Sequence, residues 1–541
     1  MSSRGGLKEL EKQMAQAASY TQWHAAAVQH DELSGKQRWK QVDQTSMYDH
    51  VAIRTRLDRL RKLRARKDDN GLLFALNEGI HGNMAGMGKS ELYAKAKVGT
   101  KTLITEYIEE IADALQYLAK LRSNKINFYD KLEFFRRASH CYGLSALMLS
   151  GGGALGHFHL GVLKALVEQN LLPDIISGSS AGSIMAAVVG THTNEEMQQF
   201  FDPKHISMEV KADAPWLKHV LWGKNHQIDV HDLQLTIERL LPDLTFEEAF
   251  ERTGKHINIS IAPTELHQTS RLLNAITSPN VYIRTAVMAS CAIPGVFPAV
   301  ILQAKNEHGD AQAYLPNRKW MDGSVTDDLP AKRLARLYGV NHYVVSQINP
   351  YVLWVERSHN DQNGITAAAT QFSQKLTKEW LRSIHGLSRR YLKNAPRWNM
   401  LLSSMNALAS QNYAGDINIL PSFRFYDPRK ILSPLSEKDL LFLIDEGERA
   451  TWPQIETIRN CSLISSTLHK ILVDFEKKEE SNLATLRSEE SIEAAAKAKI
   501  KPPRKAGIKS KSDDRRTVKT KRKSVAKGAQ NGNGARLAGG L

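Results

Sequence analysis

The sequence has little cysteine and no long hydrophobic run. Its three cysteines, Cys141, Cys291 and Cys461, are odd in number and widely spaced in a chain of 541 residues. This argues against a disulfide framework and matches no metal-ligand spacing, so no metal or other cofactor is expected. Without an apolar run of 18 residues we expect no transmembrane helix. The polar start MSSRGGLKELEKQ lacks the apolar core of a secretory signal, so we predict no signal peptide and a cytoplasmic location.

Positive charge is concentrated near the end of the sequence. The net charge is +16, and residues 501–527 hold twelve Lys or Arg against two Asp. The remainder is only mildly basic, so the charge says little about the substrate of the folded part. Residues 501–541 contain no aromatic side chain to stack on bases. We predict a disordered basic tail at 475–541 that contacts anionic lipid, and no specific nucleic-acid partner.

Two patterns of apolar residues divide the rest of the chain. Helical spacing predicts helices over 7–18, 20–30, 49–66 and 101–122. From residue 144 the order becomes strand, glycine turn, helix, strand, sharp bend and helix, and further strands are predicted at 257–262, 271–275 and 342–347. This order indicates the α/β class, with a mostly parallel central sheet in a three-layer sandwich, preceded by a helical N-terminal domain.

The second bend contains a candidate nucleophile. Gly178-Ser179-Ser180-Ala181-Gly182 follows the short strand 175–177 and precedes a helix of small residues. Gly-x-Ser-x-Gly in this context lets the chain turn so sharply that the Ser180 hydroxyl stands at the strand end, near the N-terminus of the next helix. The structural alternative is a glycine turn with an ordinary serine.

The first turn, Gly151-Gly152-Gly153-Ala154-Leu155-Gly156, has two interpretations. Gly-x-Gly-x-x-Gly after a strand is also the dinucleotide fingerprint, which needs an acid at the end of the following strand. Asp174 precedes that strand, and Ser180 occupies the place where the acid is needed. An anion-stabilising loop fits better, because successive glycine N–H groups can face a developing negative charge.

A serine nucleophile needs a base. His157, His159 and His192 are nearest in sequence, and none has a distinctive setting. Asp322, in Trp320-Met321-Asp322-Gly323-Ser324, follows an apolar pair and is the better candidate, although Asp-Gly alone indicates only a turn.

Together these pieces resemble the patatin-like phospholipases, whose pattern is Gly-Gly-Gly-x-x-Gly, then Gly-x-Ser-x-Gly, then Asp-Gly-Gly/Ala. The segments YTQWHAAAVQHDELSGKQRWK, LYAKAKVGTKTLITEYIEE and YAGDINILP resemble its triacylglycerol-lipase-like branch. Two departures concern neither candidate catalytic group: Leu155 stands where many patatins have Arg, and Ser324 is the third residue of the Asp-Gly motif.

The resemblance implies a serine lipid acyl hydrolase that cleaves glycerolipid esters, triacylglycerol or phospholipid, at a membrane or lipid-droplet surface. Ser180 would be the nucleophile and Asp322 the base. Gly151, Gly152 and Gly153 would form the oxyanion hole, supported by Gly156, Gly178, Gly182 and Gly323. The resemblance also implies four parts: a helical domain at 1–140, a catalytic α/β domain at 141–345, a mainly helical extension at 346–474 and the tail at 475–541.

Two other functions stay open from the sequence. A Ser-His-Asp esterase would use His342, His359 or His385 as base, and a catalytically silent lipid-binding or scaffold protein would use none of them. Peripheral membrane association is expected, and the segment with Trp216 and Trp222 and the stretch from Trp380 to Trp398 are candidates for docking on a membrane.

Overall fold

A computed structural model describes residues 3–80, 83–122, 125–201, 230–265, 269–294, 297–349, 353, 415–423 and 436–499. The chain divides into two compact units, Met1–Lys477 and Lys478–Leu541. The two Trp-containing segments, His359, His385 and the basic stretch 501–541 lie outside the described residues.

The N-terminal region is helical, as predicted. Its α-helices are α1 (Ser3–Gln16), α2 (Tyr20–Leu33), α3 (Lys36–Gln41), α4 (His50–Ala65), α5 (Asp69–Asn77), α6 (Ser90–Tyr93), α7 (Thr102–Lys120) and α8 (Phe128–Tyr142), and Met84–Gly86 is a 3₁₀ turn. Side chains that satisfy the first free N–H groups mark several starts: Asp49 accepts from Ala52 N, and Asn127 and Asp130 form a capping box. One apolar core joins α4, α5, α7 and α8 to the helix α24 (Ile455–Lys499).

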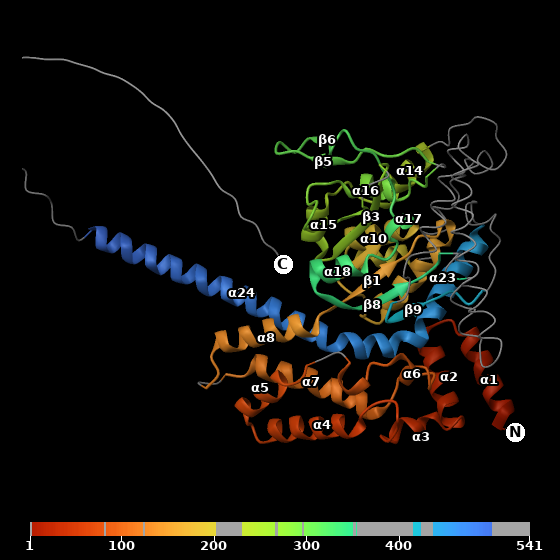
Figure 1. Cartoon of the computed structure of the whole chain (residues 1–541), viewed down its shortest axis with the longest axis vertical. Coiled ribbons are helices and arrows are strands. Elements are labelled where there is room, and N and C mark those ends of the chain that lie inside the picture. Colours follow the sequence, from red (N-terminus) through yellow and green to blue (C-terminus); the bar gives the residue numbers. More distant parts are fainter. Residues whose placement is uncertain are drawn as a thin grey trace, which may run out of the picture. The chain divides into compact units, whose positions relative to one another are not determined.

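Seven of the described strands build one sheet (Figure 1). They are β1 (Leu144–Leu149), β2 (Ile175–Gly178), β3 (His256–Pro263), β4 (Arg271–Leu273), β7 (Trp320–Asp322), β8 (Val340–Ser346) and β9 (Ile417–Ile419). The order is β4-β3-β2-β1-β8-β9, and β7 also pairs with β3. The pairs β1–β2, β1–β8, β2–β3 and β8–β9 are parallel, whereas β4 and β7 run antiparallel to β3. The predicted mostly parallel sheet is confirmed. The short strands β5 (Gln303–Lys305) and β6 (Ala311–Ala313) form a separate hairpin.

Helices cover both faces of the sheet, which confirms the three-layer arrangement. On β1, Leu147 and Leu149 belong to the core cluster that includes α9, α10, α15 and α16, whereas Ala146 and Met148 face the cluster that includes α18. The helices of this region are α9 (His157–Glu168), α10 (Ala181–Thr191), α11 (Asn194–Phe200), α14 (Val230–Leu240), α15 (Phe246–Thr253), α16 (Ile283–Ser290), α17 (Ser324–Asp327), α18 (Ala331–Tyr338) and α23 (Glu437–Thr451), with 3₁₀ turns at Gly153–Gly156 and Trp452–Gln454.

Two details differ from the sequence-based expectation. The sequence predicted no strand after residue 347, but β9 supplies the edge strand beside β8. The tail was predicted to begin at residue 475, but α24 continues to Lys499. Its residues after 475 are rich in Glu, Lys and Ala, which are strong helix formers. The predicted domain boundaries stay predictions.

Candidate active site

Ser180 lies on a strained bend between β2 and α10. Its φ of 49° and ψ of −123° place an L-residue in a region that costs energy, so the surrounding structure must hold it there. The bend is possible because its flanking glycines leave room: a Cβ on Gly178 would collide with the Gly182 carbonyl, and one on Gly182 with the Leu149 carbonyl. The result is a buried serine, 6% exposed, at the N-terminus of α10.

Asp322 reaches the same place from a strand that runs the other way. β7 pairs antiparallel with β3, with Asp322 opposite Ile261. The Asp322 carboxylate accepts the Ser324 N–H at 2.8 Å, and the Ser180 hydroxyl lies near it. Burial raises the pKa of Asp322 to about 6, and the polar groups of Ser324 and Ser180 act against that rise. A carboxylate with such a pKa is ionised at neutral pH and is still basic enough to accept a proton.

The glycine turn lies directly against these two residues. A Cβ on Gly151 would be 3.3 Å from the Ser180 Cβ and 3.0 Å from the Ser324 Cβ, and one on Gly156 would be 2.9 Å from the Ala181 Cβ. Among the described residues the N–H groups of Gly152 and Gly153 have no hydrogen-bond partner. Gly151 differs, because its N–H donates to Asp328 Oδ1 at 2.8 Å. The N–H groups of Gly152 and Gly153 can therefore donate hydrogen bonds to an anion beside Ser180. Gly151, which has no side chain, leaves space for that anion.

Three polar residues that the sequence did not point to hold this arrangement in place. Ser290 Oγ accepts the Ser180 N–H at 3.0 Å and donates to the Ser260 carbonyl at 2.8 Å, which ties the bend to β3. His159 and Asp328 lie behind the glycine turn and are fully or almost fully buried. The sequence carried only a weak signal for these two: His159 lies in the first turn of the helix after the glycines, and Asp328 comes six positions after Asp322.

The alternative base His342 lies elsewhere. It pairs with Ser145 on β1, four positions before Leu149, which marks the strand end near Ser180. At about 3.3 Å per residue this separation is roughly 13 Å. His342 Nδ1 lies 3.2 Å from Ser145 Oγ, so this side chain has a local partner instead. The described residues therefore favour Asp322 over His342 as the group that receives the proton of Ser180.

The structure also argues against the dinucleotide interpretation, because Asp174 does not lie where a ribose-binding acid is needed. Asp174 precedes β2, and its backbone carbonyl accepts the His256 N–H at 2.8 Å. It therefore lies at the strand end opposite the one that leads to Ser180, and a ribose held by Asp174 would be remote from the glycine turn.

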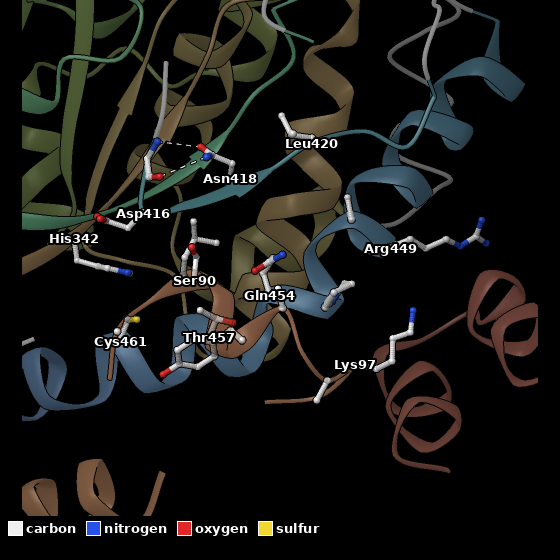
Figure 2. A pocket seen from close by; sticks show the side chains of 18 of the residues that line it. Ser90, Lys97, His342, Asp416, Asn418, Leu420, Arg449, Gln454, Thr457 and Cys461 are labelled. Carbon is white, nitrogen blue, oxygen red and sulfur yellow. Dashed lines mark hydrogen bonds between the residues drawn. The ribbon is translucent and has the colours of Figure 1, made fainter. Parts of the chain in front are cut away.

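A cavity of about 1280 Å³ lies away from this site, between the N-terminal helices, the β8–β9 edge and the helices α23 and α24. Figure 2 shows His342 on β8 and Asp416, which directly precedes β9, above Cys461, with Ser90 and Lys97 contributed by the N-terminal region. Neither Ser180 nor Asp322 lines it. In the part of the chain that the structure describes, no group of three His, Cys, Asp or Glu side chains could hold a metal ion.

Known proteins with similar sequences identify the family of this chain. The model described as "Patatin-like phospholipase" matches residues 147–335, which include the glycine turn, Ser180 and Asp322, and a domain of unknown function, DUF3336, matches residues 1–140. Triacylglycerol lipase ptl3 of Schizosaccharomyces pombe is 32% identical over 84% of this chain and 94% of its own length. The chain belongs to the patatin-like phospholipase family.

Other relatives of this patatin-like chain are longer than it. Triacylglycerol lipase 5 of Saccharomyces cerevisiae is 33% identical over 84% of the chain, and triacylglycerol lipase 4 of the same yeast is 35% identical over 83%. The chain spans 63% and 51% of the lengths of these two proteins. No helix within the described ranges has both the length and the apolar character needed to cross a bilayer.

Proposed function

We propose that the chain is a serine lipid acyl hydrolase that cleaves carboxylic ester bonds of glycerolipids, with Ser180 as nucleophile and Asp322 as general base. The observation that carries this proposal is the placement of Ser180, on its strained bend, next to the buried Asp322 carboxylate and against a glycine turn in which the N–H groups of Gly152 and Gly153 have no partner among the described residues. Relatives named as triacylglycerol lipases support a glycerolipid as the substrate.

In the first half-reaction Ser180 attacks the ester carbonyl carbon while its proton passes to Asp322. The carbonyl π electrons move to the oxygen, which becomes an oxyanion. Its charge is met by the N–H groups of Gly152 and Gly153, and the positive end of the α10 dipole lies close by. When the tetrahedral intermediate collapses, the C–O bond to the glycerol breaks and the leaving oxygen takes the proton from Asp322. An acyl ester on Ser180 remains.

In the second half-reaction water replaces the alcohol. Asp322, ionised again, takes a proton from water as the water oxygen attacks the acyl carbon. The second tetrahedral intermediate uses the same donors, and its collapse returns the proton to Ser180 and releases the fatty acid. A dyad suffices because the same carboxyl group acts as base and then as acid in each half-reaction.

We further propose that the protein works at a membrane or lipid-droplet surface, where its substrate is found. Residues 501–527, with twelve Lys or Arg against two Asp, would add electrostatic attraction to anionic lipid. A chain shortened to residue 499 should bind vesicles that contain phosphatidylserine more weakly than the full chain, and should bind neutral vesicles equally well. Equal binding of both chains to the anionic vesicles would exclude this role of the tail.

A fluorophosphonate probe tests the nucleophile. Purified protein should be labelled, and Ser180→Ala should not be, while its circular dichroism and melting temperature stay those of the wild type. Hydrolysis of triacylglycerol, phospholipid and lysophospholipid, followed by mass spectrometry, then ranks the substrates. Labelling that survives Ser180→Ala, or full activity of Asp322→Asn, would contradict the proposed dyad.

A further inference from the structure

One peptide group behind the glycine turn is held at both of its ends. It joins Ser150 to Gly151. Its carbonyl oxygen, on Ser150, lies 2.9 Å from His159 Nε2, and its N–H, on Gly151, donates to Asp328 Oδ1 at 2.8 Å. The two side chains come from different elements: His159 belongs to α9, and Asp328 directly follows α17.

The hydrogen bonds of His159 define its tautomer. A carbonyl oxygen only accepts, so Nε2 carries the hydrogen that binds Ser150 O. Nδ1 is then the acceptor for the Ser346 hydroxyl at 2.7 Å. The ring is completely buried, and burial lowers the pKa of His159 to about 4, so it stays neutral with both nitrogens used. Nothing in this setting gives His159 a proton to exchange with a substrate.

Asp328 is held just as firmly from the other side. Its carboxyl group is 1% exposed, and Oδ2 lies 3.5 Å from the Asn349 Nδ2. Its backbone carbonyl accepts the Ser179 hydroxyl at 2.9 Å, and Ser179 directly precedes Ser180. Asp328 therefore connects the glycine turn and the nucleophile bend, which are far apart in sequence.

The next peptide group, which joins Gly151 to Gly152, is oriented by the Ser150 side chain. Ser150 Oγ accepts the Ile348 N–H at 2.8 Å and lies 3.3 Å from the Gly151 carbonyl, to which it donates. In a trans peptide the N–H points opposite to the C=O, so holding Gly151 O on one side directs the Gly152 N–H to the other. Gly152 has no side chain to restrict its backbone, so these contacts rather than its own sterics orient its N–H.

We propose that His159 and Asp328 are positioning residues that clamp the Ser150–Gly151 peptide and so aim the Gly152 N–H at the oxyanion. Their role rests on the proposed serine-hydrolase function, but neither residue touches the substrate. Burying an imidazole and a carboxyl group is costly unless both are hydrogen-bonded, and here each side chain is bonded to the same peptide group.

Steady-state hydrolysis by four variants of the full chain tests the clamp. Asp328→Asn keeps an acceptor for the Gly151 N–H, since its Oδ1 can face Gly151 while the Asn349 amide turns its oxygen toward the new NH₂ group. Asp328→Ala removes the acceptor. Likewise His159→Gln keeps an N–H donor, and His159→Phe removes it. We expect kcat to fall by about 100-fold in the Ala and Phe variants with little change in KM, the range seen when an oxyanion donor is lost, and to stay within about threefold in the Asn and Gln variants.

The double variant Asp328→Ala/His159→Phe adds a readout that a purely structural role would not move. Because both residues act on one peptide group, its kcat should fall about as far as that of either single variant, not by the product of the two effects. Asp327→Ala is the matched control: Asp327 neighbours Asp328 but pairs with Arg333 at 3.2 Å, and its loss should leave kcat unchanged.

The outcomes distinguish a failure of the proposed clamp from a failure of the proposed Ser180–Asp322 dyad. If Ser180→Ala abolishes hydrolysis while Asp328→Ala and His159→Phe retain it, the dyad stands and the clamp is wrong. If Asp328→Asn is as inactive as Asp328→Ala, Asp328 acts through its charge and the clamp is again wrong. If Asp328→Ala does not fold, the comparison of His159→Phe with His159→Gln decides, and equal kcat values in those two variants overturn the proposal.

Discussion

The N–H of Gly151 donates to the carboxylate of Asp328 at 2.8 Å, across 177 positions of sequence. This bond gives Gly151 and its neighbours different tasks. Gly151 is held in place and leaves space beside Ser180, whereas the N–H groups of Gly152 and Gly153 have no hydrogen-bond partner in the part of the chain that the structure describes. In the proposed mechanism, Gly151 would therefore anchor the loop, and Gly152 and Gly153 would be its two donors, whereas the resemblance had implied all three glycines as an oxyanion hole.

The pH dependence of hydrolysis should report Asp322. The base must be ionised to accept the Ser180 proton, and burial raises the pKa of Asp322 to about 6. We therefore expect kcat/KM to be at its plateau above pH 7 and to fall tenfold per pH unit well below 6. A pH–rate profile of the wild type measures this, and Asp322→Asn should be inactive at every pH. A profile that is flat down to pH 4.5 would contradict an Asp322 base.

Gly151→Ala should lower both activity and stability. The added methyl would lie 3.0 Å from the Ser324 Cβ and 3.3 Å from the Ser180 Cβ, so the nucleophile or the turn must shift. Overpacking of this kind costs about 1–3 kcal/mol, and a shift at the reacting atoms should reduce kcat by about 10- to 100-fold. Gly5→Ala, where a methyl meets nothing within 4 Å, is the control and should be fully active. Wild-type kcat in Gly151→Ala would show that the turn does not lie against the reacting serine as described.

Stability should depend on pH through Asp328. Burial raises the pKa of its carboxyl group from 3.8 to about 7, with a further rise from the charge of Asp322. A raised pKa means that the folded state retains a proton that the unfolded chain releases. The stabilisation is thus fully present below pH 3.8 and is lost as the pH rises through 7. The difference in unfolding free energy between wild type and Asp328→Asn should change by roughly 4 kcal/mol between pH 4 and pH 8 in favour of the variant.

Denaturant unfolding of both proteins at several pH values measures this difference. The contribution of Asp322 is common to both and largely cancels. A difference that stays constant from pH 4 to pH 8 would show that Asp328 is ionised throughout this range, contrary to its raised pKa.

Thiol reagents should label Cys141 first and leave hydrolysis intact. Cys141 is exposed on α8, whereas Cys291 is buried and Cys461 is partly buried on the wall of the cavity. Burial raises the pKa of both Cys291 and Cys461 to about 12, so both should stay protonated and react slowly at neutral pH. Mass spectrometry after brief treatment with N-ethylmaleimide should find one modified cysteine in the native protein and three after denaturation. Loss of activity on labelling of Cys141 alone would link activity to a cysteine that the proposed mechanism does not use.

Much of the fold was predictable because it is encoded locally. The apolar run 144–149, the glycines after it and the helical spacing from 154 to 168 correspond to β1, the glycine turn and α9. Two errors were also local in origin. The charge of residues 475–499 was interpreted as disorder, although their strong helix formers continue α24, and β9 was too short to stand out from the turn residues around it.

The sequence by itself determined the candidate chemistry: a serine between two close-packing glycines, a glycine turn after a buried strand, and an aspartate after an apolar pair. Each depends on backbone rules that act over a few residues. Only the tertiary structure decided which side chains meet. His159 on Ser150, Asp328 on Gly151 and Ser290 on Ser180 are contacts that form only when the helices α9 and α16 and the segment after β7 pack against the ends of β1 and β2, and no local spacing encodes such partners. That is why the reacting residues could be named from the sequence, while the residues that hold them in position could not.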